Sequence, residues 1–136
     1  MRLRHVAIGM LAILCSCAPG ADAPLTPELE AGHEVYSSIC ATCHGGNGDG
    51  GSAPALTDVL ETFATCADQI EWITLGSDRY RDERGPTYGD TDKEITSVMP
   101  EFGKTLSERE IAAVAAFERH RFGGDEEAVA AGDCGL

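Results

Sequence analysis

The stretch Cys40-Ala41-Thr42-Cys43-His44 decides how this chain is interpreted, because it places two thiols and an imidazole at a fixed short spacing. Cys-x-x-Cys-His is the attachment pattern of a c-type haem. At the end of a helix, two cysteines three residues apart reach the two vinyl groups on one edge of a porphyrin. The next residue, His44, is then carried beneath the ring, where its imidazole can bind iron. The pattern predicts one covalent haem c, attached at Cys40 and Cys43 and ligated by His44.

Three other roles for the two cysteines are open. A thioredoxin-like redox pair requires a βαβ pattern, and no run in the sequence has a convincing strand period. A zinc site requires a second ligand pair at short spacing, which the sequence does not contain. A structural disulfide between Cys40 and Cys43 would leave His44 without a role.

The amino end indicates export. A positively charged start precedes an apolar stretch over 6–14, which is too short to span a bilayer. The run Leu14-Cys15-Ser16-Cys17 resembles a bacterial lipobox and predicts a lipoprotein-type signal peptide over 1–17, with lipid on Cys17. Two or more acyl chains would anchor the protein on the periplasmic side of a bacterial membrane. Cleavage within 18–23 without lipidation and a retained membrane helix are the alternatives.

The rest of the chain divides into a flexible tether over 18–25 and one domain over 26–136, and this mature part is acidic. The full chain has 10 Lys and Arg against 23 Asp and Glu, a net charge of −13. Removing the signal takes away Arg2 and Arg4 and no acidic residue, which leaves 8 against 23, a net charge of −15. This charge makes nucleic acid a poor partner and would attract a redox protein with a basic docking surface. Acidity that only maintains solubility is the alternative.

Apolar spacing and capping signals predict an all-α domain. The clearest signal is the capping-box pair Ser107 and Glu110, which opens the last helix. The expected elements are helices over 26–40, 68–75 and 107–123, a short turn over 56–61 and a polar loop over 77–98.

Several motifs in order make the sequence resemble the class I c-type cytochromes, the bacterial mono-haem cytochrome c family. They cover nearly all of the mature chain. They are the first-helix run 32–36, the motif 40–44, Pro54-Ala55-Leu56, Met99-Pro100-Glu101-Phe102-Gly103 and the last helix over 106–122.

This resemblance implies the cytochrome c fold, in which three to four main helices wrap around one haem. It implies that Gly32 permits close packing of the terminal helix, and that Pro54 and Leu56 border the haem. The Pro54 carbonyl would accept a hydrogen bond from the iron-binding imidazole. Met99 would be the second axial ligand.

Met99 is also the only methionine that remains once Met1 and Met10 leave with the signal, and the following proline stiffens its loop. A core methionine is the alternative. His33 and His120 are rival iron ligands, but the first is too close to the attachment site and the second is near the end of the last helix.

Two further cysteines, Cys66 and Cys134, have no role in the family pattern. In an oxidising compartment we expect them to form a disulfide that ties the C-terminal tail to the middle helix. Two free or intermolecular thiols are the alternative.

The expected function is electron transfer by a His/Met-ligated haem c that cycles between Fe(II) and Fe(III) in an extracytoplasmic redox chain. The chain is expected to be a monomeric electron carrier and not an enzyme by itself. Two alternatives are the electron-accepting subunit of a larger oxidoreductase and a gas or redox sensor, which would need a labile Met99.

Overall fold

The computed structural model describes residues 24–136. The predicted signal peptide, its Cys17 lipidation site and most of the predicted tether lie outside the described residues. Within the described part, no helix is long and apolar enough to cross a membrane.

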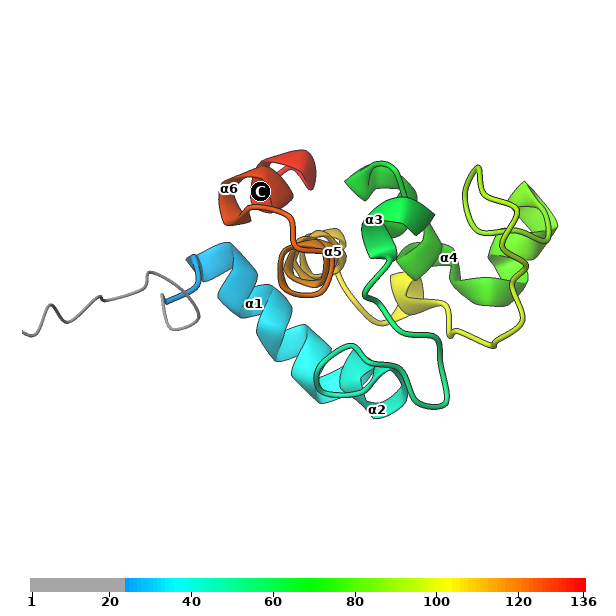
Figure 1. Cartoon of the computed structure of the whole chain (residues 1–136), viewed down its shortest axis with the longest axis horizontal. Coiled ribbons are helices and arrows are strands. Elements are labelled where there is room, and N and C mark those ends of the chain that lie inside the picture. Colours follow the sequence, from blue (N-terminus) through cyan, green and yellow to red (C-terminus); the bar gives the residue numbers. More distant parts are fainter. Residues whose placement is uncertain (1–23) are drawn as a thin grey trace, which may run out of the picture.

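The domain is all-α, as predicted (Figure 1). Residues 24–136 contain no β-strand, only an isolated antiparallel bridge between Thr87 and Glu94. The elements are α1 (Pro27–Val35), the π-helix η1 (Tyr36–Cys40), α2 (Ala41–His44), α3 (Val59–Thr62), α4 (Cys66–Arg84), the 3₁₀ helix η2 (Phe102–Lys104), α5 (Glu108–Arg121) and α6 (Glu127–Asp133).

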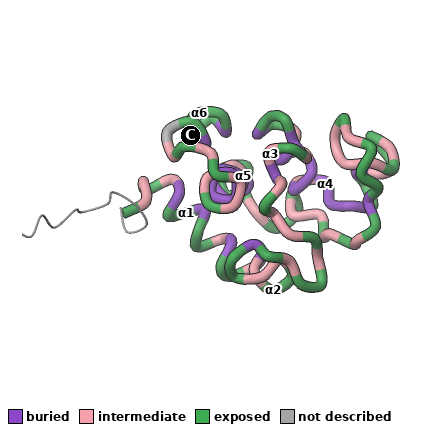
Figure 2. The backbone as a smooth tube through the Cα atoms, in the orientation of Figure 1, coloured by how far each residue is buried: buried purple, intermediate pink, exposed green. Residues whose placement is uncertain are grey.

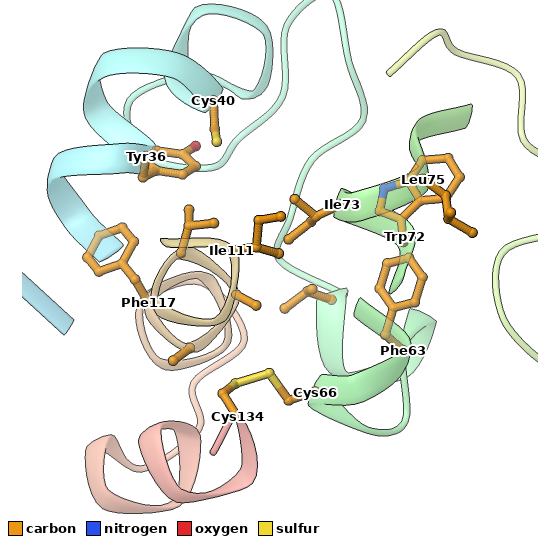
Figure 3. Packing of buried hydrophobic residues seen from close by; sticks show 14 of the residues in the cluster. Tyr36, Cys40, Phe63, Cys66, Trp72, Ile73, Leu75, Ile111, Phe117 and Cys134 are labelled. Atoms are coloured by element: carbon orange, nitrogen blue, oxygen red, sulfur yellow. A yellow bond between two sulfur atoms is a disulfide. The ribbon is translucent and has the colours of Figure 1, made fainter. Parts of the chain in front are cut away.

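Helix α5 lies at the centre of the domain and packs against α1, α4 and α6 (Figures 1 and 2). The predicted capping box forms: Ser107 Oγ accepts from the Glu110 N–H, and the Glu110 carboxylate accepts from the Ser107 N–H. The predicted apolar face is buried, with Val114 fully inaccessible and Phe117 nearly so. Figure 3 shows Ile111 and Phe117 on α5, with Tyr36 on the neighbouring segment above them.

Helix α1 begins as predicted and continues through η1 and α2 into the cysteine motif. Thr26 Oγ1 accepts from the Leu29 N–H at 3.3 Å, and Pro27 occupies the first turn, where its missing N–H costs nothing. Gly32 lies where α1 crosses α5. A Cβ at Gly32 would lie 2.1 Å from the Ala113 carbonyl oxygen and 2.7 Å from the Phe117 Cβ.

Gly32→Ala should therefore force the two helices apart, because the obstructing oxygen belongs to the backbone and cannot rotate away. We expect the free energy of unfolding to fall by about 3 kcal/mol, the upper end of ordinary overpacking costs. Chemical denaturation of the mature protein measures this. Gly132→Ala is the matched control, since Gly132 lies in α6 with no atom within 4 Å of an added Cβ. It should be neutral or slightly stabilising, and equal losses in both variants would contradict the prediction.

The middle helix differs from the prediction in length. It begins at Cys66, with Thr65 and Asp68 forming a capping box, and it is interrupted at Gly76, where φ is 66° and ψ is 175°. Helical structure then resumes and extends to Arg84, so residues 77–84, predicted as loop, are helical. Glycine tolerates this conformation without Cβ strain, which is why the predicted stop is only a kink.

Tertiary contacts stabilise the second half of α4. Tyr80 is buried and packs edge-on against Trp72, with ring centroids 5.2 Å apart. Arg84 pairs with Glu71 on the first half of the helix. The outward residues are charged and give no apolar period, so the pattern of the sequence does not indicate a helix there.

A short C-terminal helix, α6, was not predicted. Cys66 and Cys134 form a disulfide with their Cα atoms 5.2 Å apart, which joins the end of α6 to the start of α4 (Figure 3). Glu127 Oε1 accepts from the Thr26 N–H at 2.7 Å, which links α6 to the start of α1. The helix has only seven residues, most of them small or acidic, so its sequence has no apolar period that would indicate a helix.

Candidate haem site

A cavity of about 500 Å³ opens between the cysteine motif, the following loop, α4 and the 97–102 segment. This volume lies in the range of small-molecule and cofactor sites. All six residues predicted to bind the cofactor line it: Cys40, Cys43, His44, Pro54, Leu56 and Met99. The structure thus brings together residues as far apart in sequence as Cys40 and Met99.

The two motif cysteines occupy different environments. Cys40 ends η1 and is 9% exposed, whereas Cys43 lies in α2 and is exposed. Burial, and then the nearby Glu118 carboxyl, raise the pKa of the Cys40 thiol to about 12. The Cys40 sulfur is therefore a protonated, apolar part of the cavity wall, and the Cys43 sulfur lies at its mouth.

The His44 imidazole is fixed by the chain that follows it. Its Nδ1 lies 2.8 Å from the Pro54 carbonyl oxygen. A carbonyl oxygen only accepts hydrogen bonds, so Nδ1 carries the proton and Nε2 keeps its lone pair. An imidazole of this tautomer, held by its other nitrogen, is the usual form of a metal-binding histidine.

Backbone hydrogen bonds hold the Gly-rich loop beneath the motif. The Gly50 N–H donates to the His44 carbonyl at 2.8 Å, and the Ala53 N–H donates to the Cys43 carbonyl at 3.2 Å. The Leu56 N–H donates to the Gly48 carbonyl at 2.8 Å. The loop therefore folds back on the motif and places its proline carbonyl and its leucine side chain at the cavity.

Met99 is held on the far segment by the kink in α4. The Ser77 N–H donates to the Met99 carbonyl at 2.9 Å, and the Met99 N–H donates to Ser77 Oγ at 3.1 Å. Ser77 is fully buried. A Cβ at Gly76 would lie 2.6 Å from the Pro100 carbonyl, so only glycine lets the loop approach this closely. Sequence reasoning missed Ser77, because a serine after a helical glycine gives no distinctive signal.

The two rival histidines lie outside the cavity lining. The His33 ring packs against Phe117 with centroids 5.2 Å apart and is exposed on α1. His120 Nδ1 lies 3.1 Å from the Asp125 carbonyl oxygen near the end of α5.

Residues outside the sequence motifs also line the cavity. Trp72 and Tyr88 form an aromatic wall, with ring centroids 4.8 Å apart. Lys93 lies at the rim and pairs with Asp58. Lys93 comes from the polar stretch 77–98, whose long-range contacts no local pattern indicates.

A buried carboxyl, Glu118, also lines the cavity from α5. It is 5% exposed and accepts a 2.8 Å hydrogen bond from Gln69 Nε2. Burial raises its pKa from 4.5 to about 8, and the Gln69 hydrogen bond acts weakly in the opposite direction. Below pH 4.5 the carboxyl is neutral in both folded and unfolded chains. As the pH rises from 4.5 to about 8, the unfolded chain is ionised while the folded chain keeps its proton, so the stability that the neutral acid contributes is lost across this window.

The donor set fits a haem. It contains two sulfurs at attachment spacing, an imidazole with a free Nε2, a thioether on a separate segment and walls that are mostly apolar. Among residues 24–136, no three His, Cys, Asp or Glu side chains converge as a metal cluster would require. Such a mixed sulfur and imidazole set around an apolar cavity matches haem ligation.

Comparisons with known proteins agree with this geometry. Residues 27–117 match the family model described as cytochrome c oxidase, cbb3-type, subunit III. No curated protein matches the sequence significantly. The crystal structure of the c-type cytochrome XoxG from Methylobacterium extorquens AM1 superposes with a TM-score of 0.51 at 20% identity, over 79% of this chain and 67% of that one. This likeness extends to the fold alone. Since the family model spans most of the domain, the chain belongs to this family of class I c-type cytochromes, which transfer electrons by means of haem.

Proposed function

We propose that the chain carries single electrons on one haem c, attached covalently through Cys40 and Cys43, with His44 and Met99 as axial ligands. One observation supports this most strongly. The two attachment sulfurs, the imidazole and the only methionine of the described residues line the same cavity. The haem, when bound, supplies an iron centre that cycles between Fe(II) and Fe(III).

For electron transfer, the residues around the cavity need to hold the two proposed ligands in fixed positions. His44 is oriented by its Nδ1–H bond to Pro54, and Met99 is held through its backbone by Ser77. A thioether ligand favours the reduced iron and raises the potential, which suits an electron carrier. Because both ligands are fixed by the fold, the site has no position reserved for a substrate. Leu56 and the other apolar wall residues exclude water from the centre.

The route for electrons is the mouth of the cavity. Cys43 is exposed there, and Val98, which precedes the methionine, is 78% exposed. An exposed apolar contact within an acidic surface suits brief docking with a basic redox protein, whose approach the charge of this chain accelerates. We propose that the protein acts as a monomer outside the cytoplasm. Its signal over 1–17 is removed, and lipid on Cys17 anchors it to the membrane.

A second candidate is the electron-accepting subunit of a larger oxidoreductase. The description of the matching family, an oxidase subunit, favours it. Purification from mild detergent extracts separates the two. A stoichiometric redox enzyme that stays with the chain through two chromatographic steps would support the subunit. A chain that elutes alone at monomer size would support the free carrier.

Met99→Ala tests the ligand assignment. The haem should remain attached, but the weak far-red absorption band of methionine bound to Fe(III) should disappear. The potential should fall by on the order of 0.1 V, a part of the roughly 0.8 V range over which axial ligands set haem potentials. The reduced variant should also bind carbon monoxide at neutral pH, and the parent protein should not.

Val98→Ala is the control for Met99→Ala, because Val98 is the neighbouring residue and its side chain is largely exposed. It should keep the far-red band and the potential. A Met99→Ala protein with an unchanged band would remove Met99 as a ligand. Fast carbon monoxide binding by the parent protein would favour the gas sensor over the carrier.

A further inference from the structure

Glu118 is an acidic side chain inside the cofactor cavity, and neither the family pattern nor the proposed mechanism uses it. Its carboxyl is 5% exposed and has one hydrogen-bond donor, Gln69 Nε2 at 2.8 Å. Among residues 24–136, no lysine, arginine or histidine forms an ion pair with it. The amide oxygen of the same side chain, Gln69 Oε1, is buried without a hydrogen-bond partner among the described residues.

The groups that face Glu118 are neutral. From η1 come Tyr36 and Cys40, whose pKa values burial and then Glu118 itself raise to about 12. From α4 comes the uncharged Gln69. A carboxylate here would lack both water and a cation, and burying such a charge is costly.

Charged groups on the other elements packed against α5 are engaged elsewhere. The adjacent Arg119 donates to the Phe63 carbonyl at 3.0 Å and is shared between two acidic side chains. Several titratable groups on these elements also have partners of their own. Asp133 of α6 lies near Arg119, Asp58 before α3 pairs with Lys93, Lys104 of η2 pairs with Glu101, and His33 of α1 packs against Phe117.

We propose that Glu118 is a redox-linked proton site, which binds a proton when the centre in the cavity is reduced and releases it when the centre is oxidised. This inference rests on the proposed function, because it requires a one-electron centre in the cavity. In the oxidising direction one electron leaves for an oxidised redox protein. The carboxyl O–H bond breaks, its electron pair stays on the oxygen of Glu118, and the proton passes to solvent. Reduction reverses both transfers.

The sign of the coupling follows from electrostatics. Oxidation adds one positive charge to the centre, and a positive charge in a cavity of low polarity favours the ionised carboxyl. The pKa of Glu118, which burial raises to about 8, must therefore be lower in the oxidised than in the reduced protein. We expect at least a tenfold difference in acidity, equivalent to about 59 mV for a one-electron couple.

The experiment is a redox titration of the mature haem-loaded protein at a series of pH values from about 5 to about 10, which brackets the ordinary and raised values of a carboxyl. The midpoint potential should be flat at low pH, fall as the pH rises between the two pKa values of Glu118, and become flat again. In Glu118→Gln, which keeps the shape but cannot ionise, the fall should be lost. Asp58→Asn is the matched control. Its carboxylate also borders the cavity but is half-exposed and paired, and the fall should persist in this variant.

A second readout does not depend on the variant folding. Infrared difference spectra of oxidised minus reduced wild-type protein should show loss of the C=O band of a protonated carboxyl. Carbon-13 labelling of glutamate should shift this band, which distinguishes Glu118 from carboxyls of the cofactor. Among the glutamates of the described residues, Glu118 alone is buried, so the labelled signal is assigned to it.

The outcomes separate this inference from the proposed function. A haem-bearing wild type with a reversible couple and a pH-independent potential would overturn the inference alone. So would a fall that persists in Glu118→Gln, or an infrared band that labelling does not shift. A protein with no haem or no reversible couple would overturn both.

Discussion

Cys40→Ala combined with Cys43→Ala should abolish covalent haem. The purified, exported protein should fall from one haem per chain to none, and any residual pigment should be extractable with acidified acetone. The reason is geometric, because these two sulfurs alone among the cysteines of the described residues line the cavity. Haem staining after denaturing electrophoresis measures the loss.

The chain supplies its own control for this experiment. Cys66→Ala combined with Cys134→Ala removes the same number of sulfurs outside the cavity lining and should keep one haem per chain. Covalent haem in the first double variant, or its complete loss in the second, would contradict the assignment of the motif cysteines.

The parts of the fold that local signals control could be predicted. Helix starts depend on adjacent caps, and Thr26 and the Ser107–Glu110 pair mark α1 and α5 correctly. Interruption at Gly76 was also expected. The continuation over 77–84 was not, because it depends on contacts such as Tyr80 with Trp72 that are absent from any local window.

The candidate site divides in the same way. Residues in motifs, from Cys40 to Met99, were placed at the cavity because fixed spacings link them to a known chemistry. Gln69 and Glu118, which line the cavity, were missed, and so was Ser77, which bonds the Met99 backbone. All three are buried. These three residues lie in helices, and the apolar pattern of a helix indicates only which of its faces points inward. Whether an inward polar residue meets a partner is decided by tertiary packing.

These missed residues explain how the fold holds two distant segments across one cavity. The kink at Gly76 turns the Ser77 backbone toward Met99, and the second half of α4 secures that kink through Tyr80. The helical extension that sequence reasoning did not predict is therefore linked to the placement of the proposed sulfur ligand.

Among the substitutions considered, removal of the Cys66–Cys134 disulfide should lower the free energy of unfolding the most. The bond closes a loop of 68 residues, and constraining the unfolded chain over this length contributes about 4 kcal/mol. In a domain of this size we expect Cys66→Ala combined with Cys134→Ala to lower the Tm by roughly 10–20 °C. Thermal unfolding of the haem-loaded protein, followed by circular dichroism, measures the change.

Two polar contacts of α6 should keep this helix in place when the disulfide is removed. Thr26 bonds Glu127 and Arg119 lies 3.6 Å from Asp133, so α6 keeps polar contacts with α1 and α5 when the sulfurs are removed. The double variant should therefore fold with its haem but unfold more easily, and a reductant should lower the stability of the parent protein by the same amount. Val129→Ala, at a half-exposed position of α6, should change stability by less than about 0.5 kcal/mol. If the double variant unfolded at the same temperature as the parent, the disulfide would be a consequence of the fold and would add nothing to its stability.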